Sequence, residues 1–203
     1  VRSDYVVILA GDHVYKMNYA AALAAHVARG APCTVACIEV PRHEARSFGV
    51  MQIDHSDRIV DFVEKPDDPP AMPGKPDSAL ASMGLYIFDT AYLLAELARD
   101  AGDNDSTHDF GKDIIPHAVR NGHAAAHHFS ASAVGGHETN APYWRDVGTI
   151  DAFWEANLGL ASIAEIHAAI VDLRRYQPVI GVIAGQVGCF GGMSIAAGLC
   201  SAL

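Results

Sequence analysis

The sequence contains little cysteine and is poor in positive charge. Among its 203 residues there are four cysteines, and 14 lysines and arginines stand against 24 acidic residues, giving a formal net charge of −10. So few cysteines in a chain of this length exclude a disulfide framework and favour the cytoplasm as the compartment. The shortage of basic residues argues against binding to nucleic acid or to an anionic membrane surface.

The first two cysteines, Cys33 and Cys37, fall on a predicted strand. Their spacing places them on one face about 13 Å apart, too far for a shared metal ion or a bridge, so we expect them to pack in a core. The half-apolar composition excludes a disordered chain. The sequence begins without methionine or a visible leader, and we expect an internal piece of a longer protein.

Charge is also missing from the C-terminal end, since residues 179–203 have no charged side chain. By length alone this segment is a candidate transmembrane helix. Its six glycines, with Gln186 and Pro178 nearby, instead favour a strand, a glycine loop and a helix of small residues. We favour the second interpretation, and both stay open here.

Up to about residue 157 the pattern alternates between strands and helices, which indicates an α/β domain with a mostly parallel sheet and one inserted hairpin. The predicted strands are 5–10, 32–40, 48–53, 58–64, 82–88 and 122–130, with a hairpin turn at 54–57. The predicted helices are 18–29, 90–99, 110–120 with a break at Pro116, and one opening at Thr149.

The apolar run 5–10 stops at Gly11 and is followed at once by Asp12. Such a run is typical of a strand buried on both faces, and in α/β sheets ligands bind beyond the carboxyl ends of these strands. Asp12 could therefore hold a divalent cation, or it could cap the helix that starts near Asn18. His13 could contact the same ligand, although a lone histidine more often has a structural role.

Three further groups lie at predicted strand ends or in the adjoining loops. Glu64 and Lys65 could bind sugar hydroxyls and a phosphate, or form a solvated charge pair. Residues 82–84, Ser-Met-Gly, leave room for a ligand. Asp146 offers a second carboxylate, and with Asp12 it could share one Mg²⁺ with a substrate phosphate.

From about residue 4 to 157, these residues together resemble the nucleotidyltransferase domain of the glucose-1-phosphate adenylyltransferase family. The resemblance implies a Rossmann-like, glycosyltransferase-A-like mixed sheet in an α/β fold. It also implies an Mg²⁺-dependent reaction in which glucose 1-phosphate attacks the α-phosphorus of ATP, giving ADP-glucose and pyrophosphate for glycogen or starch synthesis. The runs that carry it are 10–19, 47–51, 62–66, 80–88, 108–116 and 143–158.

The resemblance also implies roles for individual residues. Asp12 and Asp146 would hold the catalytic Mg²⁺, and Lys65 would complete the catalytic set by holding the sugar phosphate. The expected substrate-binding residues are Gly49, Glu64, Lys65, Ser82, Asp109 and Trp144.

Two parts of the family pattern are missing from this sequence. The family's N-terminal glycine-rich loop, which cradles the nucleotide phosphates, and its C-terminal β-helix have no counterpart here. We therefore expect residues 1–157 to be an N-terminally truncated catalytic domain with a glucose 1-phosphate and metal half-site but little or no turnover. A central strand could lack its neighbour, and a family-type homo-oligomer is left open.

Residues 155–167 and 178–200 resemble a different family, the β subunit of biotin-independent malonate decarboxylase, which has a crotonase-like fold. Gly191 and Gly192 would lie in its oxyanion loop. We expect a composite chain whose residues 158–203 form a crotonase-like strand-loop-helix fragment, or a tail in which 179–203 replaces part of the first sheet. The alternative functions are an acyl carboxyltransferase fragment and a non-catalytic binding module.

Overall fold

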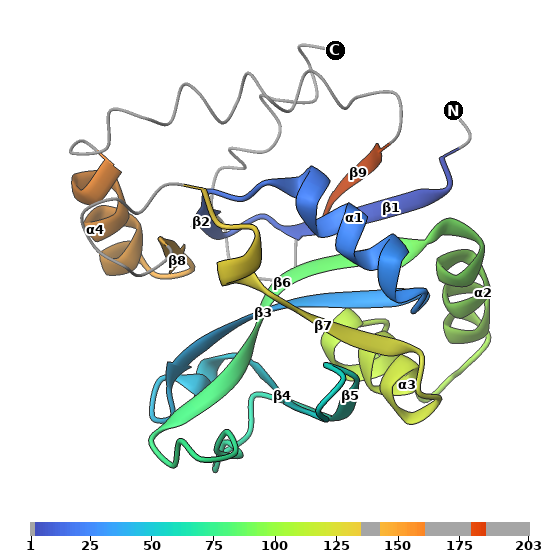
Figure 1. Cartoon of the computed structure of the whole chain (residues 1–203), viewed down its shortest axis with the longest axis horizontal. Coiled ribbons are helices and arrows are strands. Elements are labelled where there is room, and N and C mark those ends of the chain that lie inside the picture. Colours follow the sequence, from blue (N-terminus) through green and yellow to red (C-terminus); the bar gives the residue numbers. More distant parts are fainter. Residues whose placement is uncertain (1–2, 135–142, 161–179, 186–203) are drawn as a thin grey trace.

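The computed structural model describes residues 3–134, 143–160 and 180–185 (Figure 1). Its strands are β1 (Tyr5–Ala10), β2 (His13–Tyr15), β3 (Cys33–Pro41), β4 (Gly49–Ile53), β5 (Ile59–Glu64), β6 (Ser78–Asp89), β7 (Ala124–His128), β8 (Trp144–Asp146) and β9 (Ile180–Gly185). The helices are α1 (Tyr19–Arg29), α2 (Thr90–Ala101), α3 (Ile115–Arg120) and α4 (Ile150–Leu160), with short turns η1 (Ala45–Ser47), η2 (Phe110–Ile114) and η3 (Phe129–Ala131).

The main sheet is mixed, as the resemblance implied. Its order is β5-β4-β6-β1-β9, and β3 pairs with both β6 and β7. The expectation of a mostly parallel sheet is wrong: among the described strands, β6 runs antiparallel to β1, β3 and β4, and β4 runs antiparallel to β5. Only β1–β9 and β3–β7 are parallel within this part of the chain. Because the single long strand β6 runs antiparallel to three neighbours, most of the described strand pairs in the sheet are antiparallel.

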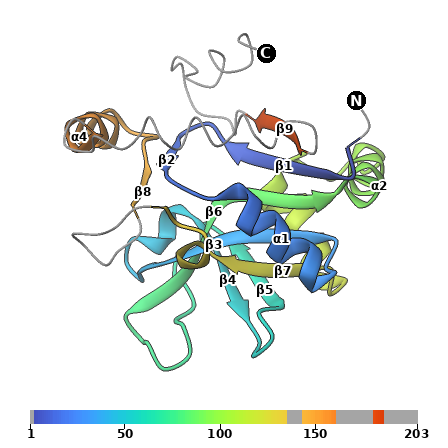
Figure 2. The same ribbon diagram turned by 45° about the horizontal axis from the view of Figure 1, so that its top comes forward.

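The two faces of the sheet are covered by different helices. Along β1, Val6 and Ile8 belong to one core cluster and Val7 belongs to the other, as the two-residue period of a strand requires. The first cluster includes residues of α2 and α3, whereas the second includes Ala22 of α1. Figure 2 shows α1 lying across the front of the sheet, consistent with this layering. The central strands of the sheet therefore lie between helices.

Helix α1 begins and ends as its sequence predicts. The side chain of Asn18 accepts a hydrogen bond from the backbone N–H of Ala21 at 3.1 Å, and Gly30 closes the helix with φ +65°. The alternative that Asp12 caps this helix is wrong, because Asn18 holds the capping position itself. Asp12 is thus available for another role.

Two predicted elements differ in their extent. The helix expected over 110–120 is a π-helical turn, η2, followed by the short α3, and Pro116 lies in the first turn of α3, where its missing N–H costs nothing. The strand expected at 82–88 begins four residues earlier, at Ser78. This extension carries β6 past the end of β1 and alongside β4.

One segment of the unusual tail is described, and it joins the main sheet. Strand β9 runs parallel to β1, from the pair Tyr5 and Ile180 to the pair Ala10 and Gly185. The strand fits both the expected strand-loop-helix tail and the alternative that 179–203 replaces part of the first sheet, and it gives β1 a second neighbour. The expected loop with Gly191 and Gly192, and the helix after it, lie outside the described residues.

Two further findings concern the apolar segments. Helix α4 leaves the side chains of Ile150, Phe153, Trp154 and Leu158 exposed. Across the described residues, no helix combines the length and the apolar character that crossing a membrane would require.

Candidate active site

The candidate site lies where the long strand β6 changes neighbours. Its residue Ala81 pairs with β4, and its residue Leu85 pairs with β1. On its other side β6 pairs with β3, and the register shifts there. Val35 pairs with Tyr86 and Cys37 pairs with Ser82, so two residues of β3 span four residues of β6. The sequence-predicted residues 82–84 therefore form an irregular stretch at the split between two parts of the sheet. Such irregularities are over-represented next to active sites because they redirect side chains.

At one end of this stretch, the structure brings Asp12, His13 and Asp146 together. One ligand atom from each lies within 4.8 Å of the others. Strands β2 and β8 pair so that His13 faces Asp146, and the N–H of Val147 donates to the carbonyl of Asp12 at 2.7 Å. Two carboxylates far apart in sequence thus meet as predicted. With the imidazole they form a donor set suited to a divalent cation.

Sequence reasoning underestimated His13, which is a member of this cluster. Its Nδ1 lies 2.5 Å from the carbonyl oxygen of Met83, and its ring packs against Trp144 with centroids 5.1 Å apart. The only signal in the sequence was its position directly after Asp12. That signal could not show that β2 would place it opposite Asp146.

At the other end, Glu64 occupies a space that two glycines leave open. A Cβ on Gly49 would lie 2.7 Å from Oε2 of Glu64, and a Cβ on Gly111 would lie 2.6 Å from the same atom. Any other side chain at either position would displace the carboxylate. Gly49 was predicted to line the sugar site, whereas Gly111 was not singled out.

The electrostatics of this half reflect its enclosure. Burial raises the pKa of Glu64, and the nearby Asp109 adds to that rise, while Lys65 and Lys112 oppose it. The side chain of Asp109 accepts a hydrogen bond from the N–H of Lys112 at 3.0 Å and so caps the turn η2. The predicted residues Glu64 and Asp109 therefore lie close together, on either side of Gly111.

Tyr86 is a further residue that the sequence analysis missed. It is buried beside the same region, its pKa is raised by that burial, and it hydrogen-bonds with Ser82. Its ring stacks on Phe110 with centroids 5.9 Å apart and an interplanar angle of 14°. Ser82 also accepts the N–H of Gly84 at 3.3 Å, so it is held within the irregular stretch of β6.

Aromatic rings connect the two halves of the site. Trp144 packs against His13 on one side and against Phe48 on the other, at centroid distances of 5.1 and 5.3 Å. The carbonyl of Phe48 accepts the N–H of Lys65 at 3.0 Å, and Lys65 itself has a positive φ of 49°. A non-glycine residue in this conformation is uncommon, and such strain concentrates at functional sites.

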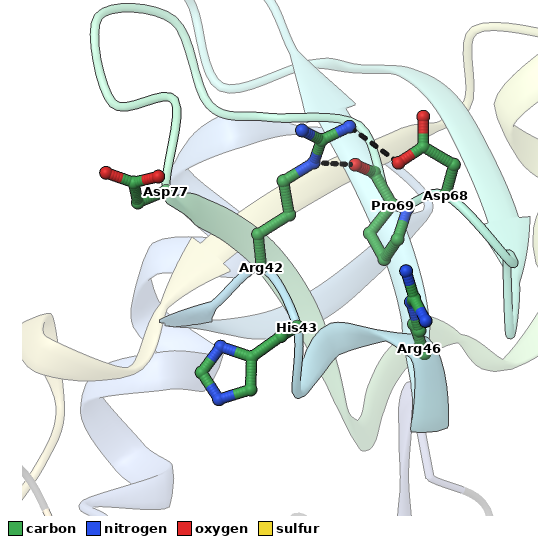
Figure 3. A pocket seen from close by; sticks show the side chains of 6 residues that line it. All are labelled: Arg42, His43, Arg46, Asp68, Pro69 and Asp77. Carbon is green, nitrogen blue, oxygen red and sulfur yellow. Dashed lines mark hydrogen bonds and ion pairs between the residues drawn. The ribbon is translucent and has the colours of Figure 1, made fainter.

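A separate hollow at the far end of β3 includes none of the predicted site residues. Figure 3 shows Arg42 reaching across it to the carbonyl of Pro69 and the carboxylate of Asp68, at 2.6 and 2.8 Å. The charge of this guanidinium is therefore already matched within the protein. The hollow is lined by Arg42, His43, Arg46, Asp68, Pro69 and Asp77.

Comparison with known proteins agrees with this geometry. The Nucleotidyl transferase family matches residues 1–163. A protein from Rhodopseudomonas palustris (strain TIE-1), named glucose-1-phosphate adenylyltransferase, is 58% identical over 159 residues, which are 78% of this chain and 38% of the relative. Proteins of the same name from Granulibacter bethesdensis and Paraburkholderia phytofirmans are 59% and 57% identical over 160 and 162 residues. These matches cover 79% and 80% of this chain, and 38% and 39% of those relatives.

The chain thus spans under two fifths of the length of these curated relatives. The family match covers both halves of the site, from Asp12 to Asp146, and it includes α4. The mixed sheet, the paired carboxylates and this match together establish that the chain belongs to the nucleotidyl transferase family.

Proposed function

We propose that this chain carries the sugar-phosphate and cation part of a glucose-1-phosphate adenylyltransferase. In that reaction a phosphate oxygen of glucose 1-phosphate attacks the α-phosphorus of ATP, the bond from that phosphorus to the bridging oxygen breaks, and pyrophosphate leaves. The names of the relatives support the choice of substrates. The site supports it independently, because the half-buried carboxylate of Glu64 and a cluster suited to a divalent cation both lie beside the irregular stretch of β6.

In this proposal Glu64 recognises the sugar. An ionised carboxylate accepts hydrogen bonds from hydroxyl groups, and enclosure strengthens those bonds. Gly49 and Gly111 keep the carboxylate from being displaced, since a Cβ at either position would overlap it. Ser82 and Asp109 would contact the same sugar, and Trp144 would form one wall of the pocket.

Lys65 and the carboxylates would handle the phosphates. Lys65 would hold the sugar phosphate as a point charge, oriented by the backbone bond to Phe48. Asp12 and Asp146 would hold Mg²⁺, which binds through few carboxylates and leaves positions for phosphate oxygens. The cation would neutralise charge that develops on the phosphates, while the protein residues supply position and exclude water.

The observation that carries the proposal is the pairing of β2 with β8, which places Asp12 beside Asp146. The experiment that tests it is calorimetric titration of the chain with glucose 1-phosphate in the presence of Mg²⁺. We expect saturable binding that Glu64→Gln weakens at least about 10-fold, the scale of a hydrogen bond to a charged group. The matched control is Glu44→Gln at an exposed glutamate. A folded chain that fails to bind the sugar phosphate would refute the proposal and favour a non-catalytic module.

We extend the proposal to the cellular compartment, the nucleotide ligands and the domain organisation of the chain. The cytoplasm is the expected compartment, which the burial of Cys33 and Cys37 as free thiols supports. ATP and ADP-glucose are the expected nucleotide ligands. Residues 1–157 would form the catalytic unit, and 158–203 would form a tail whose strand β9 pairs with β1.

A further inference from the structure

We propose that His13 supplies a third protein ligand, through Nε2, to the divalent cation held by Asp12 and Asp146. This inference rests on the proposed function, since it deepens the cation site described there. Its consequence is a preference for cations that accept nitrogen donors, such as Mn²⁺, over Mg²⁺.

The first step concerns which ring nitrogen is available. Nδ1 of His13 lies 2.5 Å from the carbonyl oxygen of Met83, and a carbonyl can only accept a hydrogen bond. Nδ1 must therefore carry the hydrogen. In the neutral ring this leaves a lone pair on Nε2. A backbone carbonyl that fixes the tautomer in this way is the usual outer partner of a metal-binding histidine.

The second step concerns how firmly the ring is held. A Cβ on Gly84 would lie 3.1 Å from Cε1 and 3.3 Å from Nδ1, so the missing side chain makes room for the ring. Trp144 packs edge-on against it with an interplanar angle of 71°. Only 9% of the His13 side chain is exposed. The imidazole is thus oriented before any ion arrives.

The third step concerns where Nε2 points. It lies 3.7 Å from Oδ1 of Asp12, and His13 faces Asp146 directly across the ladder between β2 and β8. Two ligands that share one ion at about 2.1 Å lie roughly 3 to 4 Å apart. The gap of 3.7 Å is too long for a direct hydrogen bond and matches this separation. One ligand atom from each of Asp12, His13 and Asp146 lies within 4.8 Å of the others, so a small side-chain adjustment lets the three groups share one ion.

The chemistry of the donor set then decides the preference. Carboxylate and water ligands suit Mg²⁺, whereas imidazole suits later first-row cations, and affinity for a nitrogen-containing site rises from Mn²⁺ onward. A centre with two carboxylates and one imidazole binds both Mg²⁺ and Mn²⁺, but the imidazole nitrogen increases the affinity only for Mn²⁺. Removing the imidazole should therefore affect Mn²⁺ more than Mg²⁺.

The experiment titrates the purified chain with Mn²⁺ alone and follows free Mn²⁺ by electron paramagnetic resonance. His13→Asn keeps a donor near Nδ1 for the Met83 carbonyl and removes Nε2. We expect it to weaken Mn²⁺ binding at least about 10-fold. Mg²⁺ binding, measured by competition, should change by less than about 3-fold. His43→Gln is the matched control, because the His43 side chain is 80% exposed.

A second measurement does not depend on any variant folding. Electron spin echo modulation of the Mn²⁺-bound wild-type chain should reveal directly coordinated nitrogen, and its absence would overturn the proposal. If Asp12→Asn abolishes Mn²⁺ binding while His13→Asn leaves it unchanged, the proposal for His13 fails and the carboxylate centre stands. If neither substitution alters binding, the cation centre itself is refuted.

Discussion

Gly111 lies so close to Glu64 that a methyl group on the glycine would come within 2.6 Å of the carboxylate oxygen Oε2. The two residues are 47 positions apart, and they meet because the turn η2 packs beside the end of β5. The Glu64 carboxylate, on which the proposed sugar site depends, therefore fits in its place only because residue 111 has no side chain.

The first prediction follows from this close approach of Gly111 to Glu64. Gly111→Ala should displace the Glu64 carboxylate and weaken glucose 1-phosphate binding about 10-fold or more, because the charged hydrogen bonds are lost. Calorimetry measures the effect. Gly102→Ala is the control, since its Cβ would approach the nearest atom, the Arg99 carbonyl oxygen, at an ordinary 3.5 Å. Equal binding by both variants would contradict the assignment of Glu64.

The second prediction concerns pH and stability at Glu64. Its pKa is raised by burial above the ordinary value of about 4.5. The raised value means that the folded state favours the protonated carboxyl, so its contribution to stability is present below pH 4.5 and is lost as pH rises through the folded pKa. Glu64→Gln should therefore increase the free energy of unfolding at pH 7, and the gain should vanish below pH 4.5. Urea unfolding at several pH values tests this, with Glu44→Gln as control.

The third prediction separates backbone strain from crowding at Gly84. Gly84 and Gly30 have nearly the same φ, 63° and 65°, but a Cβ on Gly84 would meet Ala10 at 2.8 Å, whereas one on Gly30 would meet nothing within 4 Å. Gly30→Ala should cost about 1–2 kcal/mol, the cost of the left-handed conformation alone. Gly84→Ala should cost more and should also weaken Mn²⁺ binding by shifting His13. A smaller loss of stability for Gly84→Ala than for Gly30→Ala would count against this packing.

The fourth prediction tests whether β9 is part of the sheet. In a parallel pair, alternate residues of one strand direct their N–H groups at the other, so proline at only one of two neighbouring positions removes a ladder bond. Val182→Pro and Ile183→Pro should therefore differ, with one lowering the thermal unfolding temperature and the other leaving it nearly unchanged. Unfolding followed by circular dichroism measures the pair. Two unaffected variants would show that 180–185 adds no strand to β1.

Much of the local structure could be predicted because its signals lie close together in the sequence. Asn18 and Gly30 bound α1 through contacts within one turn, and the hairpin at 54–57 closes through Asp54, which accepts the N–H groups of Ser56 and Arg58. Strand direction was predicted less well. No local signal reveals that β6 opposes three neighbours, since that depends on long-range pairing.

The residues of the candidate site were also predictable only in part. Asp12 and Asp146 could be proposed together because each follows or ends a strand and the family resemblance pairs them. His13 was underestimated, and Gly111 and Tyr86 were missed, because their roles come from the irregular stretch of β6 and from the turn η2. A periodicity argument assumes regular strands and helices, so it cannot anticipate these features.

The change of neighbours along β6 implies that the length of this strand is under strict constraint. Deleting or inserting one residue between Ala81 and Leu85 would shift one half of the molecule by about 3.3 Å against the other and exchange the faces of the side chains beyond that point. Beyond Lys65, the loop between β5 and β6 is not held in the ladder of the main sheet and can vary in length. Tolerance to insertion should therefore fall abruptly on passing from that loop into the strand.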